Sequence, residues 1–180
     1  MRRTSTTVLA VVGDDADAVL DALGRAPNVV TVTPAGDDAL SRAVEAWSAA
    51  QGAHAPWFAH AADPLTNVAT AWAAHYDGEG TPGDLEVAIA ELLARWRVGS
   101  VELPDYYLVS APERLPTTLR HWYLGVLHAA ARVRVAPVDA ALAAVNEVRR
   151  LGPGPWWPPL DRMLAGIDRV VPDRVGVTTT

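Results

Sequence analysis

Short apolar runs rich in β-branched residues alternate along this chain with longer segments of helical periodicity. Five such runs occupy residues 6–12, 28–33, 56–61, 105–111 and 132–138. A run of this length, bounded by glycine, proline or aspartate, is typical of a strand that is buried on both faces. Strands that alternate with helices pair in parallel, because each helix carries the chain back across the sheet.

The helical segments each have one apolar face and clear boundaries. They begin near residues 14, 38, 63, 81, 117, 139 and 158. Asp63-Pro64 is typical of a helix start, with Asp63 as the N-cap and Pro64 at the first helical position. Strands and helices together predict a three-layer, doubly wound sheet of about five mainly parallel strands, of the Rossmann-like or flavodoxin-like type. We expect one α/β domain over residues 1–172 and a flexible tail over residues 173–180.

The composition excludes several kinds of chemistry. All 15 basic residues of the 180 are arginine, and there is no cysteine. Without lysine the chain cannot carry a Walker A phosphate loop or a pyridoxal Schiff base. Without cysteine it has no disulfide, no thiol nucleophile and no zinc finger. The net charge of −6 and the scattered arginines also argue against a nucleic-acid partner.

The first residues superficially resemble a targeting segment. Two arginines at positions 2 and 3 precede the apolar run, but that run ends at Gly13 and is too short for a signal peptide. No window approaches the roughly 18 to 20 uncharged apolar residues that span a bilayer. We therefore expect a cytoplasmic protein without a membrane partner.

The predicted fold indicates where a site belongs. In doubly wound sheets, ligands bind beyond the carboxyl ends of the strands, where the strand order reverses. The loops expected there carry polar side chains that can converge. The candidate ligand-binding residues are Asp14, Asp15, His60, Asp63, Ser110 and Arg114.

Each candidate has a structural interpretation beside the functional one. Asp14 and Asp15 either cap the following helix or bind Mg²⁺, a cation that takes carboxylate oxygens. His60 and Asp63 act as a general base and its partner, or else His60 bonds to backbone at a strand end and Asp63 caps a helix. Arg114 clamps a carboxylate or phosphate, or else it pairs with Glu113 or lies in solvent.

The first quarter of the chain, where a hydrophobic strand ends in an acidic pair before an amphipathic helix and a second strand, resembles a response-regulator receiver domain. Such domains accept phosphate on an aspartate at the end of the third strand, where this sequence has Ala59, His60 and Ala61. They also use a lysine after the fifth strand, and this chain has none. The resemblance is therefore explained by a similar arrangement of strands and helices, and it does not support phosphotransfer signalling.

A second face is predicted on the helix that follows residue 117. His121, Leu124, Gly125 and His128 lie opposite its apolar stripe. A glycine inside a helix costs roughly 1 kcal/mol against alanine, so either another backbone approaches closely or nothing demands more stability there. Contact with a second subunit and plain exposure are the two interpretations.

A proline-rich segment, residues 152–159, contains two neighbouring tryptophans. The indoles either pack down to fasten the last helix or, if exposed, anchor a partner. The residues that we predict for an interface are His121, Leu124, Gly125, His128, Trp156 and Trp157.

Two functions follow as expectations. The first is a non-enzymatic α/β module that binds a protein partner or a small anionic ligand at the carboxyl ends of the strands, with a homodimer as one assembly to consider. The alternative is a Mg²⁺-dependent enzyme acting on a phosphate- or nucleotide-type substrate, with Asp14 and Asp15 as metal ligands. Apart from Mg²⁺, the sequence suggests no cofactor.

Overall fold

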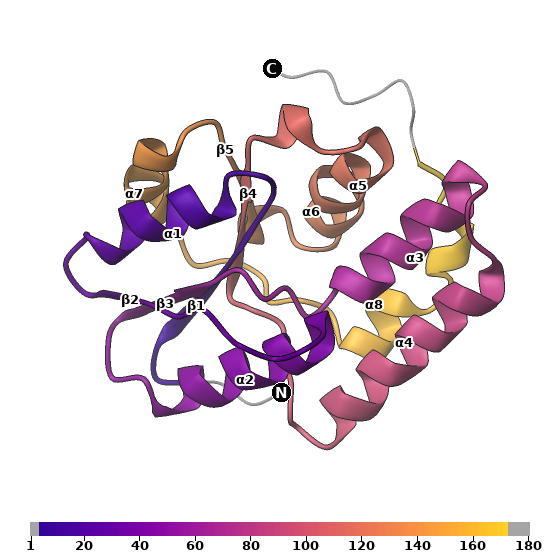
Figure 1. Ribbon diagram of the computed structural model, residues 1–180, viewed down its shortest axis with the longest axis horizontal. Coiled ribbons are helices and arrows are strands. Elements are labelled where there is room, and N and C mark those ends of the chain that lie inside the picture. The colour runs from indigo at the N-terminus through magenta and orange to yellow at the C-terminus, as the bar shows by residue number, and fades with distance from the viewer. Residues whose placement is uncertain (1–3, 173–180) are drawn as a thin grey trace.

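The computed structural model describes residues 4–172 and contains one five-stranded sheet in which every pairing is parallel. The strands are β1 (Thr7–Val12), β2 (Val29–Thr31), β3 (Trp57–His60), β4 (Tyr106–Ser110) and β5 (Val135–Val138). Helices cover both faces of the sheet (Figure 1). The predicted three-layer, doubly wound, Rossmann-like architecture is therefore confirmed.

The strand order is β2-β3-β1-β4-β5. Common doubly wound sheets have the order 3-2-1-4-5 or, in receiver and flavodoxin-like domains, 2-1-3-4-5. Here β3 lies between β2 and β1, with Phe58 opposite both Val30 and Val8. The resemblance of the first quarter to a receiver domain thus does not extend to the strand order.

The helices divide between the two faces of the sheet. Figure 1 shows α1 (Ala16–Gly24) beside α7 (Ala141–Arg150) on one face. The other face is covered by α2 (Ala39–Gly52), α3 (Thr66–Asp77), α4 (Pro82–Arg97) and the segment after β4. That segment comprises the 3-10 turn η1 (Pro112–Arg114), α5 (Thr117–His121), a π-helical stretch η2 (Trp122–Leu127) and α6 (His128–Ala130).

Side-chain alternation along the strands builds a core on each face. Leu9 and Val11 of β1 pack in the layer of α1 and α7, whereas Ala10 and Val12 pack in the opposite layer. The core on the side of Ala10 and Val12 is the larger of the two, and it contains the fully buried indole of Trp72. Near-continuous burial along β1 and β4 is what a central parallel strand requires.

The last third of the chain departs from the predicted elements. Residues 132–134 form a 3-10 turn, η3 (Arg132–Arg134), so β5 begins at Val135, later than expected. The helix expected to begin near residue 158 consists only of α8 (Leu160–Leu164), followed by the 3-10 turn η4 (Ile167–Arg169). Gly166 separates them because its φ of 74° is left-handed and cannot continue a helix. The predicted tail over residues 173–180 lies outside the described residues.

Within residues 4–172, no helix combines the length and the apolar character that a membrane crossing requires.

Candidate functional site

The crevice expected where the strand order reverses, between the carboxyl ends of β1 and β4, is filled. Gly13 follows β1 with a φ of 106°, and a Cβ atom there would lie 2.2 Å from the carbonyl oxygen of Ser110. Only glycine allows this approach. The Ser110 hydroxyl is buried and donates to the carbonyl oxygen of Val12 at 3.0 Å. Above this contact, Arg114 and Asp15 form an ion pair at 2.9 Å.

An open pocket of about 350 Å³ lies beside this closed crevice, between the loops that follow β1 and β3. It is of the size that small-molecule sites have in proteins. The β1–α1 loop, the β3–α3 loop and the π-helical stretch supply its walls. The lining residues are Val11, Val12, Gly13, Asp14, Ala16, Asp17, Ala61, Asp63, Thr66 and Tyr123.

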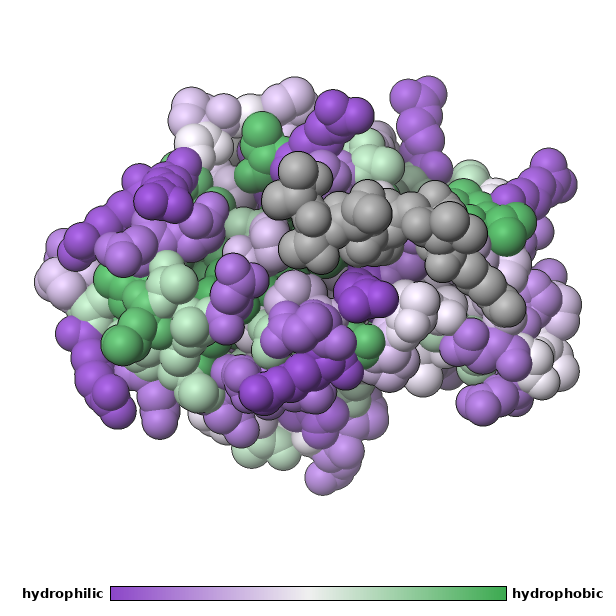
Figure 2. All heavy atoms as spheres, turned by 90° about the horizontal axis from the view of Figure 1, so that it is seen from above, coloured by the Kyte–Doolittle hydropathy of each residue, from purple (hydrophilic) through white to green (hydrophobic). Residues whose placement is uncertain are grey.

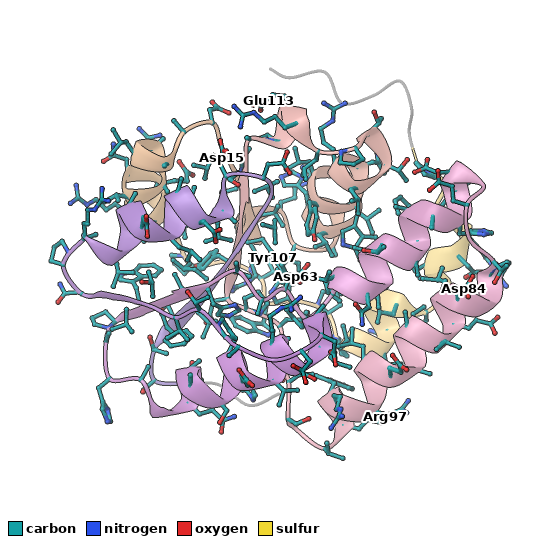
Figure 3. The ribbon with its side chains drawn as sticks, in the orientation of Figure 1. Asp15, Asp63, Asp84, Arg97, Tyr107 and Glu113 are labelled. Carbon is teal, nitrogen blue, oxygen red and sulfur yellow. The ribbon has the colours of Figure 1, made fainter. Side chains whose placement is uncertain are left out.

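Asp63 is the buried polar group of this pocket, with 2% of its surface exposed. Its Oδ1 accepts hydrogen bonds from the Leu65 amide at 2.8 Å and the Tyr107 hydroxyl at 2.7 Å, and its Oδ2 accepts one from the Tyr123 hydroxyl at 2.8 Å. Figure 3 shows Asp63 and Tyr107 side by side at the centre of the molecule. Burial raises the pKa of Asp63, and the three donors oppose that shift.

The two tyrosines are fixed as donors. Burial, and next the charge of Asp63, raise the pKa of Tyr107 and of Tyr123 well above 10. Both phenols therefore keep their protons and hold both carboxylate oxygens in place. Asp63 was expected to be the N-cap of a helix, but α3 begins at Thr66 with Leu65 in the cap position. Its carboxylate joins the first turn of α3 to β4 and to the π-helical stretch.

His60 lies outside the pocket lining. It is 4% exposed, its ring centroid is 5.9 Å from that of Phe58, and its Nδ1 has no hydrogen-bond partner among the described residues. Burial lowers the pKa of His60 to about 4. The hydrogen bonds of the Asp63 carboxylate come from tyrosines and backbone, so the predicted pair of His60 and Asp63 does not form.

The remaining carboxylates stand at the mouth of the pocket. Asp14 and Asp17 line it and are exposed, whereas Asp15 turns to Arg114. Figure 3 labels Asp15 and Glu113 at the upper edge of the molecule, and Figure 2 looks onto that edge, where hydrophilic residues predominate. Among residues 4–172, no three acidic or histidine side chains are grouped so that they can hold a metal ion. The magnesium hypothesis for Asp14 and Asp15 therefore stays a prediction.

Two of the six predicted binding residues, Asp14 and Asp63, line the same pocket. Sequence reasoning missed Tyr107 and Tyr123 as partners of Asp63, because they lie 44 and 60 residues further along the chain. Asp17 is not among the six predicted binding residues, although it lines the pocket. A three-residue spacing from Asp14 across the first turn of α1 was the available signal for Asp17.

The predicted interface on the helix after residue 117 has an internal explanation for its glycine. The His121 ring stacks on Trp72 with centroids 6.2 Å apart and an interplanar angle of 13°. A Cβ atom on Gly125 would lie 2.9 Å from that imidazole. The glycine therefore makes room for a side chain of its own helix, without a second backbone. Leu124 is partly buried against the core and His128 is half-buried, and contact of this face with a second subunit stays a prediction.

The neighbouring tryptophans pack against the body of the protein. Trp157 is 5% exposed, and its indole Nε1 donates to the carbonyl oxygen of Pro104 at 2.8 Å. The guanidinium of Arg134 lies 4.2 Å from the ring centroid of Trp156. Trp157 is thus packed down, as the first of the two interpretations expects, and a part of Trp156 and Trp157 in an interface stays a prediction.

No protein-family model matches this chain, and a search of curated proteins found no significant match. The candidate site therefore rests on its geometry and its chemistry.

Proposed function

We propose that this protein binds a small organic cation, carrying an ammonium or guanidinium group, in the pocket at the carboxyl ends of β1 and β3. The observation that carries the proposal is the arrangement of three carboxyl groups around one pocket: Asp63 in its buried wall and Asp14 and Asp17 at its mouth. No arginine or histidine is among the described residues that line it. A charged amino or guanidino group forms strong, short hydrogen bonds to such carboxylates.

The anion first expected from the sequence is less well supported. Arg114, the residue expected to hold it, is engaged by Asp15 at 2.9 Å. An anion in the pocket would face carboxylates and incur repulsion without a compensating charge. Tyr107 and Tyr123 favour the cation indirectly, because they donate to Asp63 and hold its oxygens in fixed positions. Such preorganisation lowers the entropic cost of binding.

A basic side chain of a protein partner carries the same ammonium or guanidinium group, so a protein partner that inserts such a side chain into the pocket is also consistent with this proposal. We also propose the cytoplasmic location that is expected from the sequence. We propose binding and no reaction. Three hydrogen-bond donors hold the carboxylate of Asp63 in one position, where it can accept a hydrogen bond from a ligand and orient it.

A thermal-shift titration of the full chain tests this function. Agmatine, methylguanidinium and butylamine are the cationic probes, and acetate, phosphate and Mg²⁺ are the comparison ligands. A cation at 100 times its Kd adds about 2.7 kcal/mol, which for a domain of this length raises the Tm by roughly 5–10 °C. Stabilisation by phosphate or Mg²⁺ in place of the cations would overturn the proposal and favour the alternative enzyme.

Charge-neutral variants connect any response to the pocket. Asp14→Asn and Asp17→Asn should each weaken cation binding by up to about fivefold, the range of an exposed charge pair. Asp21→Asn is the matched control, because Asp21 is exposed on α1 and does not line the pocket. An equal loss in the control would mean that the probes respond only to the net negative charge of the protein.

A further inference from the structure

A smaller hollow, which we call the side hollow, adjoins the pocket of the proposed function at the same edge of the sheet. It has a volume of about 100 Å³. Asp17 and Ala61 line both the pocket and the side hollow, so the two spaces share part of their walls. The other residues that line the side hollow are Leu20, Val32, Thr33, Pro34, Arg42 and Ala62.

The strand order β2-β3-β1 explains why the two spaces are neighbours. The pocket lies between the loops that follow β1 and β3, and the side hollow lies between those that follow β3 and β2. Adjacent strands are about 4.8 Å apart, so the two spaces are offset by about one strand spacing. One small molecule can therefore occupy both of them.

Arg42 gives the side hollow the opposite charge to the pocket. It is the one basic side chain among the described residues that line this space, and it forms no ion pair with the described carboxylates. Its Nη1 donates to the carbonyl oxygen of Gly36 at 3.2 Å. Its Nε and Nη2 donate to none of the described residues and remain open to solvent. Most of the five N–H groups of this guanidinium are therefore available to a ligand.

The surroundings of Arg42 hold its guanidinium at the side hollow. A Cβ atom on Gly36 would lie 2.7 Å from the amide nitrogen of Arg42, so the loop after β2 lies directly against the first turn of α2. The nearest acidic residue on the helix, Asp38, accepts hydrogen bonds from the amide and the hydroxyl of Ser41, both at 2.8 Å. The carboxylate that would otherwise pair with Arg42 is thus engaged as a helix cap.

The wall between the two charged regions is mostly apolar. Leu20, Val32 and Pro34 contribute carbon surface to the side hollow, and Ala61 continues this surface into the pocket. Methylene groups of a ligand can pack on such a wall, whereas a compact inorganic ion would leave it uncovered. The lining therefore favours a short carbon chain that has a positive group at one end and a negative group at the other.

We infer that the cation of the proposed function also carries a carboxylate: the ligand is an amino acid or guanidino acid whose charged groups are separated by a short carbon chain. The inference rests on the proposed function, since the ammonium or guanidinium group binds at Asp14, Asp17 and Asp63. The carboxylate reaches Arg42, because a guanidinium matches a carboxylate with two parallel hydrogen bonds. A phosphate dianion would be repelled more strongly by Asp17 than a carboxylate is.

Isothermal titration calorimetry of the full chain with matched ligands tests the inference. 5-Aminopentanoate and butylamine differ only by the carboxylate, as do L-arginine and agmatine. We expect each acid to bind about fivefold more tightly than its matched cation, the range of one partly exposed charge pair. The net charge of −6 alone predicts the opposite order, because the carboxylate makes each ligand less positive.

Two arginine variants connect the gain to the side hollow. Arg42→Gln removes the charge and keeps a side-chain amide, so we expect 5-aminopentanoate to bind no better than butylamine. Unchanged binding of butylamine would show that this variant is folded. Arg97→Gln is the matched control, because Arg97 is exposed at the end of α4, away from Asp63 in Figure 3, and lines neither space. The gain from the carboxylate should persist in it.

The outcomes separate this inference from the proposed function. Cations that bind without any gain from the carboxylate, or a gain that persists in Arg42→Gln, would overturn the inference and leave the proposed function in place. Failure of both members of each pair to bind would overturn the proposed function as well. Glycine and methylamine test the length of the chain: an equal gain for glycine would mean that the ligand does not span the two spaces.

Discussion

The opposite pKa shifts of two buried groups predict how the stability of this protein depends on pH. His60 is neutral in its buried position, and burial lowers its pKa from 6.5 to about 4. The unfolded chain takes up a proton near pH 6.5, whereas the folded chain resists it until about pH 4. Stability from His60 is therefore complete above pH 6.5 and is lost as the pH falls toward 4. The free energy of unfolding falls by about 3 kcal/mol over this window, because a tenfold difference in proton affinity corresponds to about 1.4 kcal/mol.

Asp63 contributes with the other sign. Because burial raises its pKa above 3.8, the folded chain binds a proton on this group before the unfolded chain does. Stability from this group therefore increases as the pH falls through its folded pKa. In the wild-type protein, this contribution of Asp63 offsets part of the stability that is lost when His60 is protonated.

Variants separate the two contributions. His60→Leu removes a titrating group whose Nδ1 has no hydrogen-bond partner among the described residues, and Asp63→Asn removes the opposing one. Denaturation by urea, followed by tryptophan fluorescence at several pH values between 7.5 and 4, gives the free energy of unfolding. The difference between His60→Leu and the wild type should change by about 3 kcal/mol in favour of the variant toward pH 4. Parallel curves for the two proteins would refute the assignment of a neutral, buried His60.

Three further predictions concern substitutions of single residues. Arg134→Ala should lower the free energy of unfolding by about 3 kcal/mol, since a buried guanidinium with three carbonyl acceptors is removed, and urea denaturation measures this. Gly125→Ala should destabilise by about 1–2 kcal/mol despite its better helix propensity, because its Cβ meets an imidazole at 2.9 Å. Gly52→Ala, which meets nothing within 4 Å, should not destabilise in the same assay. Tyr123→Phe leaves Oδ2 of Asp63 without its hydroxyl donor, so we expect a loss of about 1–3 kcal/mol and weaker cation binding by calorimetry. Unchanged stability in this last variant would mean that the carboxylate is not held as described.

The strands were predictable because their signal is local. Val8, Val11 and Val12 in one short run, followed by Gly13, predict a buried strand and a sharp turn without any knowledge of the rest of the chain. The capping of α4 was also local, since Thr81 and Asp84 form a reciprocal capping box within one turn. The strand order was not predictable, because crossover helices of similar length allow several neighbours for each strand.

The candidate site was predictable only in part, for the same physical reason. Parallel strands end at one edge of the sheet, so Asp14 and Asp63 could be assigned to that edge from the sequence. Whether Asp63 is buried depends on Tyr107 and Tyr123, which reach it from β4 and from the π-helical stretch. The π-helical turn at residues 122–127 has no sequence signature comparable with a proline or a cap. Contacts between distant segments therefore determine the burial and hydrogen bonding of the site, whereas local sequence patterns determine the strands and helices around it.

The two outer strands of the sheet limit how this protein can associate with itself. β2 has only three residues, and β5 includes Pro137, which has no amide hydrogen to donate. Short strands and edge prolines are poor templates for the addition of a further strand. Continuous β-sheets across two copies are thus disfavoured, and so is fibril growth from either edge. We therefore expect a dimer of this chain, if one forms, to join through side chains, and its formation to be sensitive to single surface substitutions.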